Sequence, residues 1–110
     1  MKKLLSIILT MILLMTAIAC AETFKIGMVA PITGASSLVG EYMTNGFNLA
    51  AKEINASGGI LGREIELVLA DEVDTAQKSV NAMQLLLRED DICAIIGSYY
   101  SSNAIAALPD

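Results

Sequence analysis

Polar side chains that could bind an anion are concentrated near the end of the chain. In the segment 97–103 a glycine is followed by three serines, two tyrosines and Asn103. Ser101 and Ser102 stand where a helix is predicted to begin, and serine hydroxyls with free helix N–H groups suit a carboxylate. Helix capping is the commoner role of such serines and stays open as the alternative. Tyr99 and Tyr100 are predicted as ligand walls or, alternatively, as surface packing.

A second group of reactive side chains is acidic. Asp71, Glu72 and Asp74 follow a predicted strand at 64–71. Three carboxylates so close together are able to hold a cation. A solvated turn explains them more simply, with Asp74 as helix N-cap and Gln77 completing a capping box.

Several kinds of chemistry find no support in the sequence. The chain has no histidine, which removes the commonest acid–base group and zinc ligand. Gly27, Gly34 and Gly40 are too widely spaced for a dinucleotide fingerprint, and no Gly-Lys-Ser/Thr triplet of a phosphate loop occurs. Cys93 lies in an apolar run and is predicted to be a buried, inert thiol. We therefore expect no catalysis, no metal and no cofactor.

These polar groups must be positioned by alternating strands and helices. The expected order is β-α-β-α-β-α, with strands near 25–30, 64–71 and 92–96 and helices near 38–56, 74–89 and 102–108. Such alternation predicts an α/β fold with a three-layer parallel sheet. Ligands of open α/β sheets bind outside the carboxyl ends of the strands, which selects the loops at 31–40 and 97–103.

Helical periodicity indicates which residues the first two helices bury. The first is predicted to bury Met43, Phe47, Ala50, Ala51 and Ile54. The second is predicted to bury Val80, Met83, Leu86 and Leu87.

The first 21 residues have the pattern of a secretory signal peptide. Lys2 and Lys3 precede an uncharged, mostly apolar run that ends in small residues. Cleavage before Glu22 gives a soluble, secreted periplasmic product. The alternative is cleavage before Cys20, which would leave a lipid anchor on that cysteine at the membrane.

The charge of the expected mature chain limits its partners. Removal of the leader leaves five of the seven basic residues against 12 acidic ones, a net charge of −7. An acidic chain of this kind is a poor match for nucleic acid or for an anionic membrane surface.

Over the whole expected mature chain, the sequence resembles the periplasmic leucine/isoleucine/valine-binding protein family. The most specific stretch is the Ile-Asn-x-x-Gly-Gly-Ile-x-Gly-Arg segment at 54–63. The other matching segments are Lys-Ile-Gly-Met-Val-Ala-Pro-Ile-Thr-Gly at 25–34, Gly40, Asn-Gly-Phe-Asn-Leu-Ala at 45–50, Glu-Leu-Val at 66–68 with Asp71, and Ile-Ile-Gly at 95–97 with Ser101.

The resemblance implies a type I periplasmic binding protein, in which two α/β lobes close on a small ligand. Residues 22–110 would be the N-terminal part of the first lobe, so the chain is expected to be a truncated fragment of a longer protein. The implied function is non-catalytic binding of a branched-chain amino acid, another small amino acid or a related amide. The implied partner is the membrane permease of an ABC importer.

The resemblance also suggests site residues. Ser101 occupies the position of a family serine that binds the ligand's α-carboxylate. Val39 occupies a position that lines the site and is often aromatic in the family. The ligand-sensing domain of a receptor is the alternative function, and an extracytoplasmic enzyme is a third, disfavoured by the lack of histidine and of a nucleophile motif.

Overall fold

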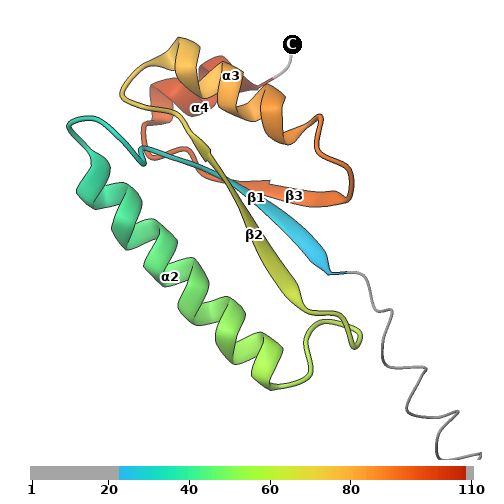
Figure 1. Cartoon of the computed structure of the whole chain (residues 1–110). Helices are drawn as coiled ribbons and strands as arrows, with labels where there is room; N and C mark the ends of the chain where they lie inside the picture. Colours follow the sequence, from blue (N-terminus) through green and yellow to red (C-terminus); the bar gives the residue numbers. More distant parts are fainter. Residues whose placement is uncertain (1–22, 109–110) are drawn as a thin grey trace, which may run out of the picture.

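A computed structural model describes residues 23–108 of the chain (Figure 1). The elements are β1 (Phe24–Ala30), α2 (Ser37–Ala56), β2 (Ile65–Asp71), α3 (Ala76–Leu86), β3 (Ile92–Ile96) and α4 (Ser101–Ala107). The predicted β-α-β-α-β-α order is confirmed. The predicted signal peptide and its two cleavage sites lie outside the described residues.

The three strands form one parallel sheet in the order β2-β1-β3, with β1 in the centre. Phe24 to Ala30 of β1 pair without interruption with Ile65 to Asp71 of β2. The pairing of β1 with β3 shifts by one residue between Lys25 and Ile26. Because all strands are parallel, their carboxyl ends meet at one edge, and the loops that follow β1 and β3 leave from that edge.

Helices cover both faces of the sheet, as the three-layer prediction requires. Figure 1 shows α2 on one face, with α3 and α4 together on the other. The hydrophobic core lies under α3, and it is built from Val29, Ala70, Ala82 and Leu86, with Val68, Met83 and Ile95 packed against it. Leu86 is 2% exposed, and its side chain covers Gly27 at the middle of β1.

The α2 face is packed less completely. Met43, Phe47 and Ala51 are half-buried, as the helical period predicts, but Ala50 and Ile54 are exposed. The prediction for these two is wrong because α2 packs mainly along β2 and buries only Gly40 completely. The C-terminal end of α2 is fixed instead by hydrogen bonds, since the Asn55 amide pairs with both the backbone N–H and the carbonyl of Ile65.

The end of α3 also differs from the prediction. The helix ends at Leu86, three residues before the predicted end. Ser79, Ala82 and Leu86 are its buried residues, whereas Val80 and Met83 are half-buried. Leu87 is 67% exposed, because it lies at the C-cap, where the chain leaves the sheet face.

Cys93 is exposed, so its predicted burial is wrong. Among the described strands β3 pairs only with β1, and Cys93, Ala94 and Ile96 of this edge strand are exposed. The Cys93 thiol donates a hydrogen bond to the Lys25 carbonyl at 3.2 Å. In the part of the chain that the structure describes, no helix is both long enough and apolar enough to span a bilayer.

Candidate functional site

The loops after β1 and β3 meet at the carboxyl edge of the sheet (Figure 1). Ser36 and Tyr100 join them through a short hydrogen bond between their hydroxyl groups. Ser36 occupies the N-cap position of α2, but its side chain makes no capping hydrogen bond. Its hydroxyl is instead part of the contact between the two loops.

Asp71, the last residue of β2, holds the loop after β1. Its carboxylate accepts hydrogen bonds from the backbone N–H of Ile32 at 3.0 Å, from the backbone N–H of Thr33 at 3.3 Å and from the Thr33 hydroxyl. It also accepts the N–H of Val73 at 2.9 Å. Partial burial raises the pKa of the Asp71 carboxyl, but the hydrogen bonds from Thr33, Val73 and Ile32 together hold it below its ordinary value.

Asp74 holds the same loop and does not cap α3. Its Oδ2 accepts the backbone N–H of Ala35 at 2.8 Å. The N-cap of α3 is Thr75, whose hydroxyl accepts the N–H of Lys78 at 3.3 Å. The predicted capping box is therefore wrong, because the Asp74 carboxylate is turned away from α3 toward the loop after β1, and Gln77 pairs with Asn81 instead.

Glu72 holds the loop after β3. Its side chain is 0% exposed, so the predicted solvated turn is wrong for this residue. Oε1 accepts the backbone N–H of Tyr99 at 3.0 Å, while Oε2 accepts the Ser98 hydroxyl and the Asn103 amide, the latter at 3.4 Å. The acidic segment after β2 therefore fixes both loops of the candidate site.

Gly97 allows the second loop to cross the end of β1. Its φ is +103°, and a Cβ at this position would lie 2.0 Å from the Val29 carbonyl oxygen. Both the backbone conformation and the close approach exclude a side chain here. The predicted loop does begin at this glycine, directly after β3.

Ser101 and Ser102 are the first two residues of α4, and both are exposed. The backbone N–H groups of Asn103 and Ala104 donate to the Tyr100 carbonyl, so Ser101 and Ser102 precede the first intrahelical hydrogen bonds. The helix thus begins at Ser101, one residue before the predicted start, and both serines are exposed at the end of the predicted loop.

The other predicted site residues lie in the same two loops or beside them. Tyr99 is 48% exposed and packs edge-to-face on Tyr100, with ring centroids 4.7 Å apart. Tyr100 is half-buried and directs its hydroxyl to Ser36. Val39 is half-buried in the first turn of α2, and its N–H donates to the Ser36 carbonyl at 2.9 Å. Ser36 thus contacts both Tyr100 and Val39.

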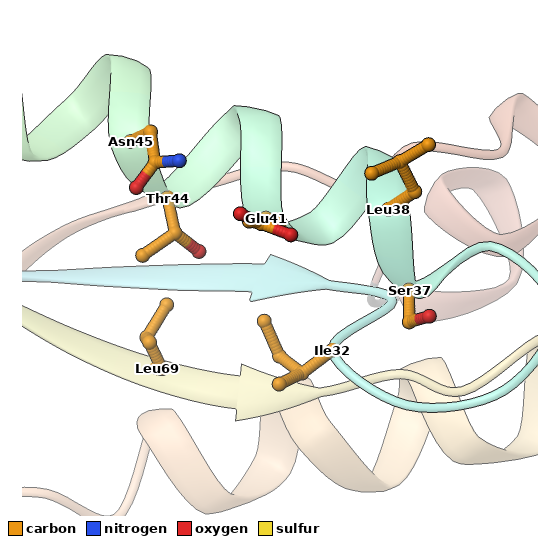
Figure 2. Close-up of a pocket in the computed structure, with 7 residues that line it drawn as sticks. All are labelled: Ile32, Ser37, Leu38, Glu41, Thr44, Asn45 and Leu69. Carbon is orange, nitrogen blue, oxygen red and sulfur yellow. The ribbon is translucent and has the colours of Figure 1, made fainter.

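A separate groove lies between the first turns of α2 and the end of β2 (Figure 2). It has a volume of about 410 Å³ and is lined by Ile32, Ser37, Leu38, Glu41, Thr44, Asn45 and Leu69. Figure 2 shows the α2 side chains above and the apolar Ile32 and Leu69 below. None of the five predicted site residues lines it. Leu69 is 43% exposed there, which makes the groove an incompletely covered part of the sheet face.

The sequence analysis did not predict the contacts that hold the site together, which are made by Ser36, Glu72, Ser98 and Asn103. One signal was available, because an Asp-Glu pair directly after a strand lies at the ligand-binding edge of a parallel sheet. Within residues 23–108, no three His, Cys, Asp or Glu side chains converge to form a metal site.

Comparison with known proteins identifies relatives of this arrangement. A family model described as "Periplasmic binding protein" matches residues 23–110. The Leu/Ile/Val-binding protein homolog 7 of Brucella melitensis is 35% identical over 95 residues, which cover 86% of this chain and 24% of the Brucella protein.

Two solved structures share the fold. The branched-chain amino acid transporter substrate binding protein of Streptococcus pneumoniae, in complex with isoleucine, is 32% identical with a TM-score of 0.71 and matches 77% of this chain and 24% of its own. A solute binding protein of an ABC transporter from Rhodopseudomonas palustris, in complex with 3,4-dihydroxybenzoic acid, is 28% identical with a TM-score of 0.67 and matches 77% and 23%.

The chain therefore spans about a quarter of the length of each of these relatives. The family model covers everything after residue 22. On this evidence the chain belongs to the periplasmic binding protein family.

Proposed function

We propose that this chain is part of an extracytoplasmic solute-binding component of an ABC importer that binds a small amino acid, with branched-chain amino acids as the first candidates. The observation that carries the proposal is the family match over residues 23–110 together with relatives named for Leu/Ile/Val binding. The protein's role is capture and delivery of the solute, without catalysis.

The proposed contact with the ligand is carboxylate recognition by the loop after β3. Isoleucine and 3,4-dihydroxybenzoic acid, the ligands of the two solved relatives, differ in every group except a carboxylate. In this chain the exposed hydroxyls of Ser101 and Ser102 are donors suited to that group. Because α4 is only seven residues long, we assign the interaction to the hydroxyls and not to the helix dipole.

The walls of the proposed site come from both loops. The exposed ring of Tyr99 offers an apolar surface beside the two serines. Tyr100 is less available, since its hydroxyl is bonded to Ser36 and its ring packs edge-to-face against Tyr99. Val39, half-buried in the first turn of α2, is the proposed apolar contact next to the first loop. The relatives are longer than this chain, and we assign the rest of a closed binding cleft to the part of their length that this chain does not span.

The location and partners follow from the same proposal. Residues 1–21 are proposed to be a signal peptide that directs the protein to the periplasm, with lipid attachment at Cys20 as the alternative. Residues 22–110 are proposed to be the N-terminal part of the first lobe. The membrane partner is the permease of the importer, to which the full-length protein delivers its ligand.

Calorimetric titration of the full-length protein that carries this sequence tests the proposal. Isoleucine, leucine, valine and 3,4-dihydroxybenzoate are titrated separately, and binding of at least one amino acid is expected. Absence of heat with all three amino acids would rule out branched-chain amino acids as the ligands. Binding of the aromatic acid alone would make aromatic carboxylates, and not amino acids, the ligand class.

Serine variants locate the carboxylate contact. Ser101→Ala is expected to weaken binding by about 1–3 kcal/mol, because the buried carboxylate loses a hydrogen-bond donor. Ser57→Ala, an exposed serine at the far end of α2, is the matched control and should bind as the wild type does. Equal affinities of the two variants would remove Ser101 from the site.

A further inference from the structure

Glu72 is a buried acid whose environment calls for an explanation. Of the acidic residues in the part of the chain that the structure describes, it alone is fully buried. Burial of a carboxylate is unfavourable unless hydrogen bonds replace the lost water. Its position right after β2 also puts it at the sheet edge where ligands of α/β proteins bind.

All the donors that satisfy this carboxylate come from one short segment, residues 98–103. The Tyr99 backbone N–H lies 3.0 Å from Oε1, and the Asn103 amide lies 3.4 Å from Oε2, which also accepts the Ser98 hydroxyl. Both oxygens are thus occupied and the side chain is closed to solvent. Glu72 therefore cannot contact a ligand itself, and any effect on binding must pass through this segment.

We propose that Glu72 is a positioning residue of the ligand site, which fixes the loop after β3 so that the Ser101 hydroxyl is held ready for a ligand carboxylate. The inference rests on the proposed function. The hydrogen-bond partners of Glu72 flank Ser101 in the sequence, because Ser98 and Tyr99 precede it and Asn103 follows it. A loop held in its binding conformation loses less conformational entropy when the ligand arrives, so it binds more tightly.

Three neutral donors satisfy the Glu72 carboxyl group and link the loop after β3 to the segment that follows β2. Glutamine has nearly the same shape but only one acceptor oxygen, so its NH2 group must face either the Tyr99 N–H or the Ser98 and Asn103 donors. Glu72→Gln thus weakens the anchoring with little change in volume.

The experiment compares Glu72→Gln with Glu66→Gln in the full-length protein. Glu66 is an exposed acid on β2 that accepts the Thr23 hydroxyl and, within residues 23–108, contacts no residue of the two loops through a hydrogen bond, so its variant is the matched control. Amide hydrogen exchange of Tyr99 is measured without ligand, with the amides of β1 as the reference for the core. Isoleucine affinity is then measured on the same samples.

In Glu72→Gln we expect the Tyr99 amide to exchange about tenfold faster or more, while the amides of β1 exchange as in the wild type. We also expect isoleucine to bind about tenfold more weakly, which is the loss expected for one hydrogen bond to a charged group. Wild-type exchange at Tyr99, or wild-type affinity despite faster exchange, would overturn the role of Glu72. If the amides of β1 also lose protection in Glu72→Gln, the variant Ser98→Ala is measured instead, since it removes one hydrogen bond to Glu72 and leaves the acid in place. Faster Tyr99 exchange and weaker isoleucine binding in Ser98→Ala, both smaller than in Glu72→Gln, would support the role of Glu72. Wild-type exchange and affinity in Ser98→Ala would overturn it.

The two proposals fail in different ways. A wild-type protein that binds no amino acid contradicts the proposed function, and the role of Glu72 in that site falls with it. A wild-type protein that binds isoleucine, with unchanged affinity in Glu72→Gln, contradicts the role of Glu72 alone.

Discussion

The two faces of the sheet are held to their helices in different ways. On the α3 face, Val29, Ala70, Ala82 and Leu86 are all buried and form one cluster. On the opposite face, the much longer α2 buries only Gly40, and Leu69 beneath it is 43% exposed. Amphipathic sequence is present in both helices, so amphipathicity alone does not decide how well a helix packs.

The α2 helix is instead attached near its two ends. At its start the preceding loop is bonded to Asp71 and Asp74, and at its end Asn55 is bonded to Ile65. Hydrogen bonds set position and direction, whereas apolar burial supplies most of the folding free energy. We therefore expect the α3 face to dominate stability and the hydrogen bonds at its two ends to set the position of α2.

The largest expected effect tests the apolar side of this comparison. Leu86→Ala should destabilise the chain by about 3 kcal/mol, because it opens a cavity over Gly27 in the core. Leu69→Ala, the same substitution on the α2 face, should cost less than about 1 kcal/mol, since this side chain is already half in water. Urea unfolding measures both. Equal losses would show that the two faces contribute alike.

The attachment of α2 at its C-terminal end gives the next effect. Asn55→Ala should lower the free energy of unfolding by about 2 kcal/mol, because the N–H and carbonyl of Ile65 lose their side-chain partner. Asn48→Ala changes an exposed amide on the same helix and serves as the control. If both variants unfold at the same urea concentration, the hydrogen bonds of Asn55 do not fix the helix.

The attachment at the other end should depend on pH. Since the pKa of Asp71 is lowered in the folded chain, its stabilisation is complete above about pH 5 and is lost as the pH falls through the lowered value. Asp71→Asn should therefore cost about 1 kcal/mol at neutral pH and progressively less in acid. Unfolding free energies from pH 7 to pH 2 measure the difference, and a constant difference over that range would contradict this cause.

The smallest effect is a stabilisation of α2 itself. Gly46 lies inside the helix, and no atom lies within 4 Å of the position of an added Cβ. Gly46→Ala should stabilise the chain by about 0.5–1 kcal/mol, because alanine loses less backbone entropy. Gly40→Ala should act in the opposite direction, since its Cβ would lie 2.2 Å from the Pro31 carbonyl oxygen. Melting temperatures of the two variants should therefore move apart.

Local patterns were sufficient to predict the elements and the loops of the candidate site. The strand at Ile92–Ile96 begins and ends where its apolar run does, and the other elements agree within one or two residues apart from the ends of α3. The position of Ser101 and Ser102 at a helix start was likewise predictable, because it depends on residues near in sequence.

Contacts between distant segments were not predictable in this way. Glu72 is buried because β1 lies between β2 and β3, so the chain after β2 reaches across the end of β1 to the loop after β3. Asp74 was assigned to the nearest helix start, but its partner is Ala35, 39 residues away. The exposure of Cys93, Ala50 and Ile54 depends on which elements cover each surface, and one segment's periodicity carries no information about that.

The edge-to-face pair of Tyr99 and Tyr100 makes the candidate site visible to ultraviolet spectroscopy. The chain has no tryptophan and three tyrosines, so two of its three strongest near-ultraviolet chromophores belong to this loop. Their rings, 4.7 Å apart and inclined by 68°, are close enough for their electronic transitions to couple. Near-ultraviolet circular dichroism of this chain will therefore report mainly on the loop after β3, and it can follow that loop without any introduced label.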